Sequence, residues 1–254
     1  VAFNRSYLKA NSQDDAHLSG KKWFPYNKGG YVRRWYGNQE LVVNFENDGR
    51  ELSNHKGAVL RNPSFYFKEC ISWGLITGPV FRYYPSGFLF DVAGMSCFFK
   101  EDENYYKAIA WFNSKVFDRA SRLISPAGKL QVGEFSKMPY SKIMPDGIER
   151  LSKDNITISK SDWDAHETSW DFQRNPLWEQ QLDTILFDMQ ERGVLSEDVA
   201  IDDIGPFNLP DLLQPLEIIV ENYESEWEDL FHQLHRNEEE LNRKFIEIYG
   251  LQDE

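Results

Sequence analysis

Residues 65–99, FYFKECISWGLITGPVFRYYPSGFLFDVAGMSCFF, consist of short aromatic and apolar runs separated by turn residues. Aromatic and β-branched residues favour strands, and breakers such as Gly78-Pro79 and Gly94 favour turns between them. No long helical pattern follows a strand before Asn104, so repeated strand–helix–strand winding is not expected. The stretch therefore predicts a mixed or antiparallel sheet.

Working outward, the same kind of run predicts further strands near the N-terminus. The full set of expected strands is 23–26, 41–45, 65–67, 71–73, 81–84, 88–90 and 96–99. Residues 104–123 follow with apolar side chains near a 3.6-residue period, which predicts one helix packed on the sheet. The fold class is therefore expected to be α+β, with a helical C-terminal segment after the sheet domain.

The helical segment is expected to contain helices over 176–192 and 212–235, with loop between them at 205–210. Pro176 suits the first turn of its helix. Asn237 followed by Glu240 has the spacing of a capping box, so a separate last helix is expected to begin there and to end near Gly250.

The charge of the chain divides near residue 145. Residues 1–145 carry 20 Lys and Arg against 13 Asp and Glu, a net of +7. Residues 146–254 carry 8 against 28, a net of −20, and the whole chain carries −13. We therefore expect a basic domain over 1–145 and an acidic helical segment over 146–254, of which only the first has a charge that suits a phosphate backbone.

Composition excludes several classes of protein. Hydrophobic residues make up 41% of the chain, which is typical of a folded protein. No apolar run approaches the roughly 20 residues of a membrane-spanning helix, and no signal-peptide pattern is present, so no membrane contact and a cytoplasmic location are expected. Cys70 and Cys97, the only cysteines, lie in apolar runs and are expected to be buried free thiols.

No strong catalytic motif is found. The chain has no phosphate-binding Gly-Lys-Ser/Thr loop and no glycine-rich cofactor loop after a first strand. The motif nearest to an amino-methyltransferase loop, Asn62-Pro63-Ser64-Phe65, lacks a second proline and is better explained as a turn. His232 and His235 have a spacing that can bind metal, but a solvated helix face is the favoured interpretation. Catalytic and metal-binding residues are therefore not expected here.

Two basic stretches carry the more specific signal. KKWFPYNKGG (residues 21–30) and RRWY (residues 33–36) interleave cations, aromatic rings and an amide. Arginine can donate two hydrogen bonds to guanine, asparagine can pair with adenine, and lysine can neutralise phosphate. Exposed loops with core aromatic residues remain the plainer alternative.

The same stretches resemble a known family. KKWFPYNKGG, YVRRWYGN and LVVNFENDG, followed in order by AIAWFNSKVF, LQVGEFSKMPY and NEEELNRKFIEIYGLQDE, are similar to the target-recognition region of bacteriophage-exclusion (BREX, phage growth limitation) adenine-specific DNA methyltransferases. The resemblance runs from about Lys21 to Glu254. It implies a parent enzyme that transfers methyl from S-adenosylmethionine to adenine N6, with its catalytic domain N-terminal to this chain.

On this resemblance the chain alone is not an enzyme and holds no cofactor. Its expected partners are double-stranded DNA, the catalytic methyltransferase domain of the same polypeptide, and other phage-defence proteins. The residues expected to contact DNA are Lys21, Lys22, Tyr26, Asn27, Lys28, Arg33, Arg34, Arg61, Asn62, Arg82, Lys129 and Lys137. Two alternatives stay open: an acidic helical scaffold for protein interaction, and the specificity domain of a fused restriction-methylation enzyme.

Overall fold

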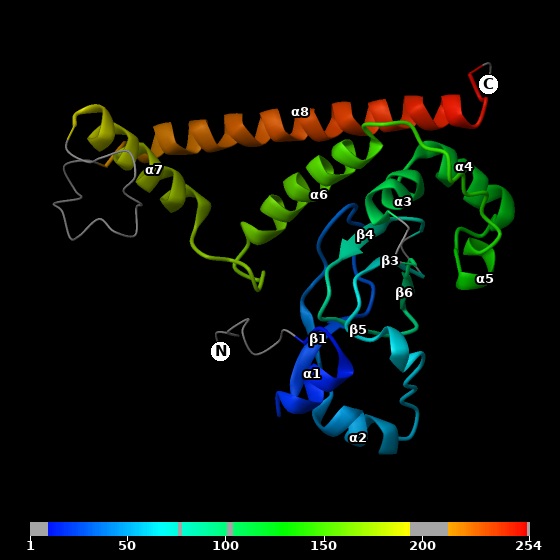
Figure 1. Ribbon diagram of the computed structural model, residues 1–254. Helices are drawn as coiled ribbons and strands as arrows, with labels where there is room; N and C mark the ends of the chain where they lie inside the picture. Colours follow the sequence, from blue (N-terminus) through cyan, green and yellow to red (C-terminus); the bar gives the residue numbers. More distant parts are fainter. Residues whose placement is uncertain (1–9, 76–77, 101–103, 194–212, 253–254) are drawn as a thin grey trace.

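The structure is a computed structural model that describes residues 10–75, 78–100, 104–193 and 213–252 (Figure 1). It confirms the α+β class, with two small sheets in the first part of the chain and a helical C-terminal segment. The loop expected at 205–210 lies outside the described residues.

The first sheet is mixed. Its central strand β1 (Trp23–Asn27) pairs antiparallel with β2 (Leu41–Asn44) and parallel with β5 (Leu89–Phe90). Two short helices, α1 (Gln13–Leu18) and α2 (Glu46–Asn54), contribute to the hydrophobic cluster of this sheet. Edge-to-face aromatic contacts hold this cluster together; the rings involved are those of Phe24, Phe45, Tyr66 and Phe67.

The second sheet is antiparallel, with β3 (Cys70–Gly74) between β4 (Phe81–Tyr84) and β6 (Gly94–Cys97). Because strand side chains alternate between faces, Ile71 and Trp73 point into the main hydrophobic core. The opposite face carries Ser72, Arg82 and Ser96. This sheet therefore has one face in the main core and an opposite face that is polar at these three residues; this polar face meets the end of β1.

The packed helix was expected to be continuous over 104–123, but it is broken into α3 (Tyr105–Phe112) and α4 (Lys115–Ile124). At the break, the Asn113 side chain accepts from the backbone N–H of Phe81 (3.1 Å) and donates to its carbonyl (3.0 Å). Ser114 then caps α4 by accepting from the N–H of Phe117. The hydrogen bonds between Asn113 and the β4 backbone thus replace the continuation of the helix. A short helix, α5 (Val132–Phe135), follows α4.

The C-terminal segment contains α6 (Ile148–Asp164), α7 (Pro176–Glu191) and α8 (Leu216–Ile248). The expected helix start at Asn237 is wrong, because α8 runs through this residue without interruption. The Asn237 side chain is buried and donates to Asn155 Oδ1 on α6 at 2.9 Å, so it joins two helices. The expected strand at 65–67 is also wrong: Pro63–Phe65 forms a 3-10 turn, and Phe67 has a left-handed φ of 65°.

The main hydrophobic core joins both parts of the chain. Trp111 and Phe117, from α3 and α4, lie in one cluster with Ile148 of α6 and with Leu241 and Phe245 of α8. The basic and acidic segments therefore share a core along α6 and the second half of α8. The first half of α8 and α7 extend away from the sheets as an arm (Figure 1).

Candidate nucleic-acid interface

The loop between β1 and β2 begins at a fixed point on the polar face of the second sheet. Asn27 is 1% exposed; its Nδ2 donates to Ser72 Oγ at 2.6 Å, and its Oδ1 accepts from the N–H of Gly29 at 3.1 Å. The backbone of β6 approaches so closely that a Cβ on Gly94 would lie 2.6 Å from the Asn27 carbonyl oxygen. Asn27 therefore joins the two sheets and does not face solvent.

The loop stays anchored beyond this point. The carbonyl of Tyr31 accepts from Asn38 Nδ2 at 2.8 Å and from Arg82 Nη1 at 3.4 Å. Further on, Trp35 exchanges backbone hydrogen bonds with β4, donating to the carbonyl of Phe81 and accepting from the N–H of Tyr83. The loop is thus held by side chains and backbone on both sides of its tip.

Arg82 is the buried support of this arrangement. Arg82 is 1% exposed, and burial lowers the pKa of its guanidinium. Burial also favours the neutral form of the neighbouring Tyr84 phenol and so raises its pKa. The Tyr84 hydroxyl donates to the Asn38 carbonyl at 3.0 Å. Asn27 and Arg82, both predicted to contact DNA, are therefore enclosed by the protein in this conformation.

Two other predicted cations face the acidic helices. Arg33 forms an ion pair with Asp162 of α6, and its guanidinium lies over the Trp163 ring at 5.0 Å from the ring centroid. Arg34 Nη1 lies 3.4 Å from Glu238 Oε2 of α8, with 47% of the arginine side chain exposed. Glu238 also accepts from Trp35 Nε1 at 2.8 Å. The RRWY stretch therefore connects the sheets to the helical segment, and Arg34 keeps part of its surface in solvent.

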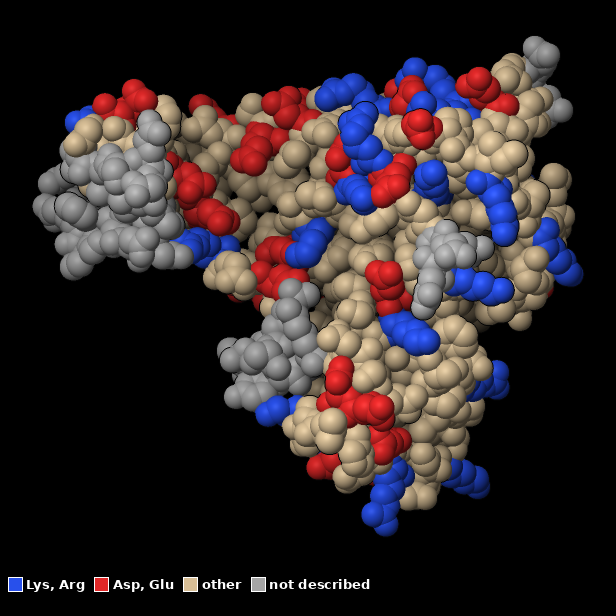
Figure 2. Space-filling model, viewed as in Figure 1, with Lys and Arg blue, Asp and Glu red and all other residues tan. Residues whose placement is uncertain are grey.

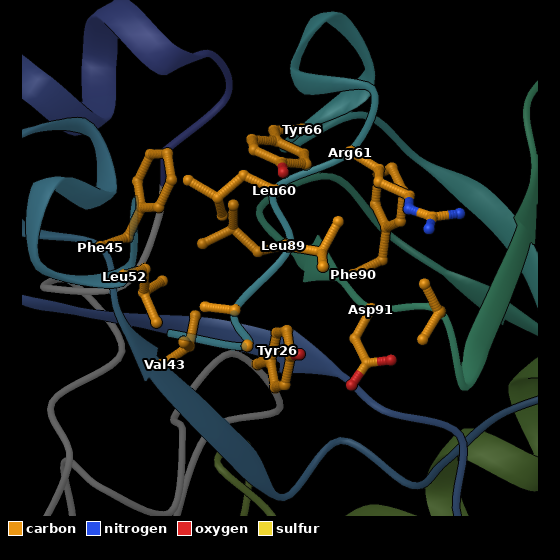
Figure 3. A pocket seen from close by; sticks show the side chains of 14 residues that line it. Tyr26, Val43, Phe45, Leu52, Leu60, Arg61, Tyr66, Leu89, Phe90 and Asp91 are labelled. Atoms are coloured by element: carbon orange, nitrogen blue, oxygen red, sulfur yellow. The ribbon is translucent and has the colours of Figure 1, made fainter. Parts of the chain in front are cut away.

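Tyr26 and Arg61 are brought together at a pocket of about 320 Å³ on the first sheet (Figure 3). The pocket lies between strand residues such as Val43 and Leu89 and the loop that carries Leu60. Burial raises the pKa of Tyr26, and a hydrogen bond from its hydroxyl to the Asp91 carboxylate raises it further. The pocket combines apolar walls with one oriented carboxylate, and Tyr26 belongs to it instead of to an open surface.

The remaining predicted residues are mostly on the surface. Lys22, Lys28, Asn62, Lys129 and Lys137 are exposed, and Lys21 is half-buried. The ammonium of Lys22 lies over the Trp23 ring at 5.7 Å from its centroid. Lys129 and Lys137 flank α5 within residues 115–142, which contain six Lys and Arg against two Asp and Glu.

Two exposed residues at the tip of the anchored loop were not among the predicted contacts. Tyr31 is 82% exposed and Val32 is 69% exposed. An apolar pair between Gly29-Gly30 and Arg33-Arg34 was the available signal, but sequence reasoning about cations and amides overlooked it.

Charge is unevenly spread over the molecule. Figure 2 shows Asp and Glu gathered over α7 and the adjoining half of α8, and Lys and Arg more frequent along the flank near α4. Residues 176–191 and 216–231 together contain ten Asp and Glu and no Lys or Arg. This acidic arm would repel a phosphate backbone, whereas the exposed cations Lys22 and Lys28 lie beside β1 on the sheet side.

Within the described ranges, no group of three or more His, Cys, Asp or Glu side chains is arranged to hold a metal ion. His232 and His235 each lie near one carboxylate of their own helix, Glu228 at 3.8 Å and Glu239 at 3.9 Å. In the same described part of the chain, no helix has both the length and the apolar character needed to cross a membrane.

Comparison with known proteins gives the class of enzyme to which the chain is related. No established family model matches it, but two proteins similar to it are adenine-specific methyltransferases. It is 41% identical to the adenine-specific methyltransferase BrxX of Escherichia coli O9:H4 (strain HS) over 176 residues, which are 68% of this chain and 14% of that protein. It is 34% identical to the adenine-specific methyltransferase PglX of Lacticaseibacillus casei (strain Zhang) over 243 residues, 92% of this chain and 18% of that protein. The chain is homologous to one part of these methyltransferases and spans less than a fifth of their length.

Proposed function

We propose that this chain is the DNA sequence-recognition module of an adenine-N6 DNA methyltransferase that belongs to a phage-defence or restriction-modification system. The observation that carries the proposal is the match of 92% of the chain to only 18% of an adenine-specific methyltransferase. In this proposal the catalytic domain of the same polypeptide binds S-adenosylmethionine and transfers the methyl group. The present chain holds the duplex and selects the site.

The physical need for such a module follows from the reaction. A base that is modified within a duplex must be flipped out of the stack, which costs a few kcal/mol. Contacts to the flanking duplex offset this cost and at the same time select the sequence.

The electrostatics of the sheet side support this role. Residues 21–34 carry five Lys and Arg and no Asp or Glu. We assign phosphate contacts to Lys22, Lys28, Lys129 and Lys137, and contacts to base edges or phosphates to Arg34, Arg61 and Asn62. Asn27, Arg33 and Arg82 take a different role in the proposal, because they hold the loop in place.

Neutralising the exposed lysines tests the proposal. The double variant Lys22→Gln/Lys28→Gln should weaken duplex binding for all sequences and should lower the slope of log affinity against log salt by about two, one for each lysine. Lys153→Gln/Lys244→Gln, on α6 and α8, makes the same change of charge and serves as the control. Equal affinity and slope for the two double variants, measured by fluorescence anisotropy, would contradict the assignment.

The acidic arm supports a second function, docking to a protein. Phe187 and Phe231 are 65% and 62% exposed on α7 and α8, in an arm where carboxylates outnumber cations such as Arg192, which pairs with Asp188. Exposed aromatic side chains favour protein interfaces, and the charge calls for a basic partner surface. Calorimetric titration with the purified remainder of the parent polypeptide should show binding that Phe187→Ser/Phe231→Ser weakens. Equal binding by that variant would remove the arm from the interface.

A further inference from the structure

Tyr31 and Val32 form an apolar tip that the fold keeps in water. They are adjacent in the chain, and their exposed fractions are 82% and 69%. Single exposed apolar residues are common on protein surfaces, but here two lie in succession on a loop that is anchored on both sides. The tip lies between Lys28, which is exposed, and Arg34, whose side chain is 47% exposed.

The backbone at the tip is already ordered. The two hydrogen bonds that the Tyr31 carbonyl accepts, from Asn38 Nδ2 and Arg82 Nη1, fix the chain while the Tyr31 side chain points away from the protein. On the other side, Arg33 is tied to Asp162 and also donates from Nε to the Tyr36 carbonyl at 3.1 Å. A loop ordered before binding loses little conformational entropy when a partner arrives.

The conformation of the loop requires glycine at the two positions before the tip. Gly29 and Gly30 have φ angles of +84° and +123°, which side-chain-bearing residues rarely adopt. A Cβ on Gly29 would lie 3.0 Å from the Ala93 carbonyl oxygen, and one on Gly30 would lie 2.8 Å from the Asn38 side chain. The loop therefore packs tightly on Ala93 and Asn38, and the next two residues are exposed.

The charge around the tip selects the kind of partner. Cations before and after an apolar pair suit a duplex, because they can contact phosphates while the apolar side chains reach the bases. Apolar side chains inserted between base pairs are a known means of unstacking and kinking DNA. A protein partner would need an acidic rim to match the same cations, and DNA supplies negative charge at every step.

We infer that Tyr31 and Val32 act as a wedge that enters a base-pair step of duplex DNA and unstacks it. The inference rests on the proposed recognition function and deepens it. Insertion at a step next to the target adenine would lower the cost of flipping that base, since one stacking contact is already broken. Steps that unstack easily would then be preferred, which adds sequence selection without hydrogen bonds to bases.

The test uses the whole chain and duplexes that carry 2-aminopurine at successive positions, whose fluorescence rises when the base is unstacked. The wild-type chain should raise the signal at one position. Tyr31→Ala/Val32→Ala should abolish this rise and weaken binding about 10-fold, a loss typical of one stacking contact. The slope with salt should stay unchanged, because no cation has been removed.

Two controls make the outcome decisive. Leu18→Ala removes another 82% exposed apolar side chain, on α1, and should change neither signal. Tyr31→Phe should retain most of the unstacking, since the ring is preserved, and thermal melting should show the same stability for all variants. If the wild-type chain binds duplex and the double variant binds and unstacks it equally well, Tyr31 and Val32 do not act as a wedge, and the proposed recognition function is unaffected. If the wild-type chain binds no duplex, the recognition function and the wedge both fail.

Discussion

At the scale of single residues, Arg33 is the point where the basic loop and the acidic helices meet. It joins an ion pair with Asp162, a ring contact with Trp163 and a hydrogen bond to the Tyr36 carbonyl. Asp162 and Trp163 belong to α6, whereas Tyr36 belongs to the same loop as Arg33. The ion pair joins residues that are 129 positions apart in the sequence. Arg33 therefore stabilises the position of the loop that Arg34 and Tyr31 share.

Arg33→Ala is expected to lower the free energy of unfolding by about 1–2 kcal/mol, since a partly exposed ion pair contributes up to about 1 and a cation–π contact about 0.5–1. Urea unfolding measures the change. Arg50→Ala removes an exposed arginine of α2 and should cost less than about 0.5 kcal/mol. Equal losses for the two variants would show that Arg33 does not anchor the loop.

The burial of Cys70 should make the free energy of unfolding depend on pH. Burial raises the pKa of its thiol to about 12, whereas the thiol of the unfolded chain ionises near pH 9. Above pH 9 the unfolded state therefore loses a proton that the folded state keeps, so the free energy of unfolding should fall as pH rises. The contribution of Cys70 is fully present below pH 9 and is lost between pH 9 and 12.

Urea unfolding at pH 7.5, 9 and 10.5 measures this dependence. Cys70→Ala should have a shallower decline above pH 9 than the wild-type chain, by up to about 1.4 kcal/mol per pH unit. Tyrosines that do not interact with Cys70, such as Tyr26, whose pKa is also raised, affect both proteins equally and so cancel in the comparison. Parallel declines would contradict a buried neutral thiol.

At the scale of elements, most strands of the two sheets and α7 could be predicted from the sequence. Strand runs bounded by Gly and Pro are local signals, and Pro176 lies in the first turn of α7, as the sequence predicted. The break after α3 could not be predicted, because it depends on Asn113 reaching the backbone of Phe81, far away in sequence. The predicted helix start at Asn237 was wrong for the same reason, because the partner of this side chain, Asn155, is on another helix.

The candidate site shows the same limit. The sequence showed which stretches are basic, yet it could not separate exposed Lys22 and Lys28 from buried Asn27 and Arg82. That separation depends on the packing of the β1–β2 loop against the polar face of the second sheet. Alternation within β4 indicated that Arg82 faces away from Phe81, but which element covers that face is set by tertiary structure alone.

Helix α8 packs in the main core along its second half, whereas its first half packs on α7 and carries an exposed aromatic side chain; this difference can be tested along a single element. Phe245 is 0% exposed and contacts the Trp111 ring at 5.4 Å between centroids, whereas Phe231 is 62% exposed. Phe245→Ala should cost about 3–5 kcal/mol of unfolding free energy through the cavity it leaves. Phe231→Ala, the matched control on the same helix, should cost less than about 0.5. Similar losses would show that the arm half of α8 packs as tightly as the core half.

At the scale of the whole molecule, opposite charges are placed on different parts of one connected fold. The core that joins α3, α4, α6 and α8 fixes the sheets relative to the helices, so the acidic arm of α7 and the first half of α8 keeps its distance from the sheet side. Such an arrangement would guide a duplex toward the sheets by repulsion at one end and attraction at the other. The arm remains available for a protein partner.

Sequence recognition by the whole chain can be measured by fluorescence anisotropy with a pool of duplexes that share fixed ends and a random core, titrated across salt. A recognition module should bind with an affinity that falls with salt by a log–log slope of about −0.9 for each phosphate contact, and it should enrich one sequence on repeated selection. No binding at low salt, or salt-dependent binding from which no sequence is enriched, would contradict a recognition module and favour the protein-docking function of the arm.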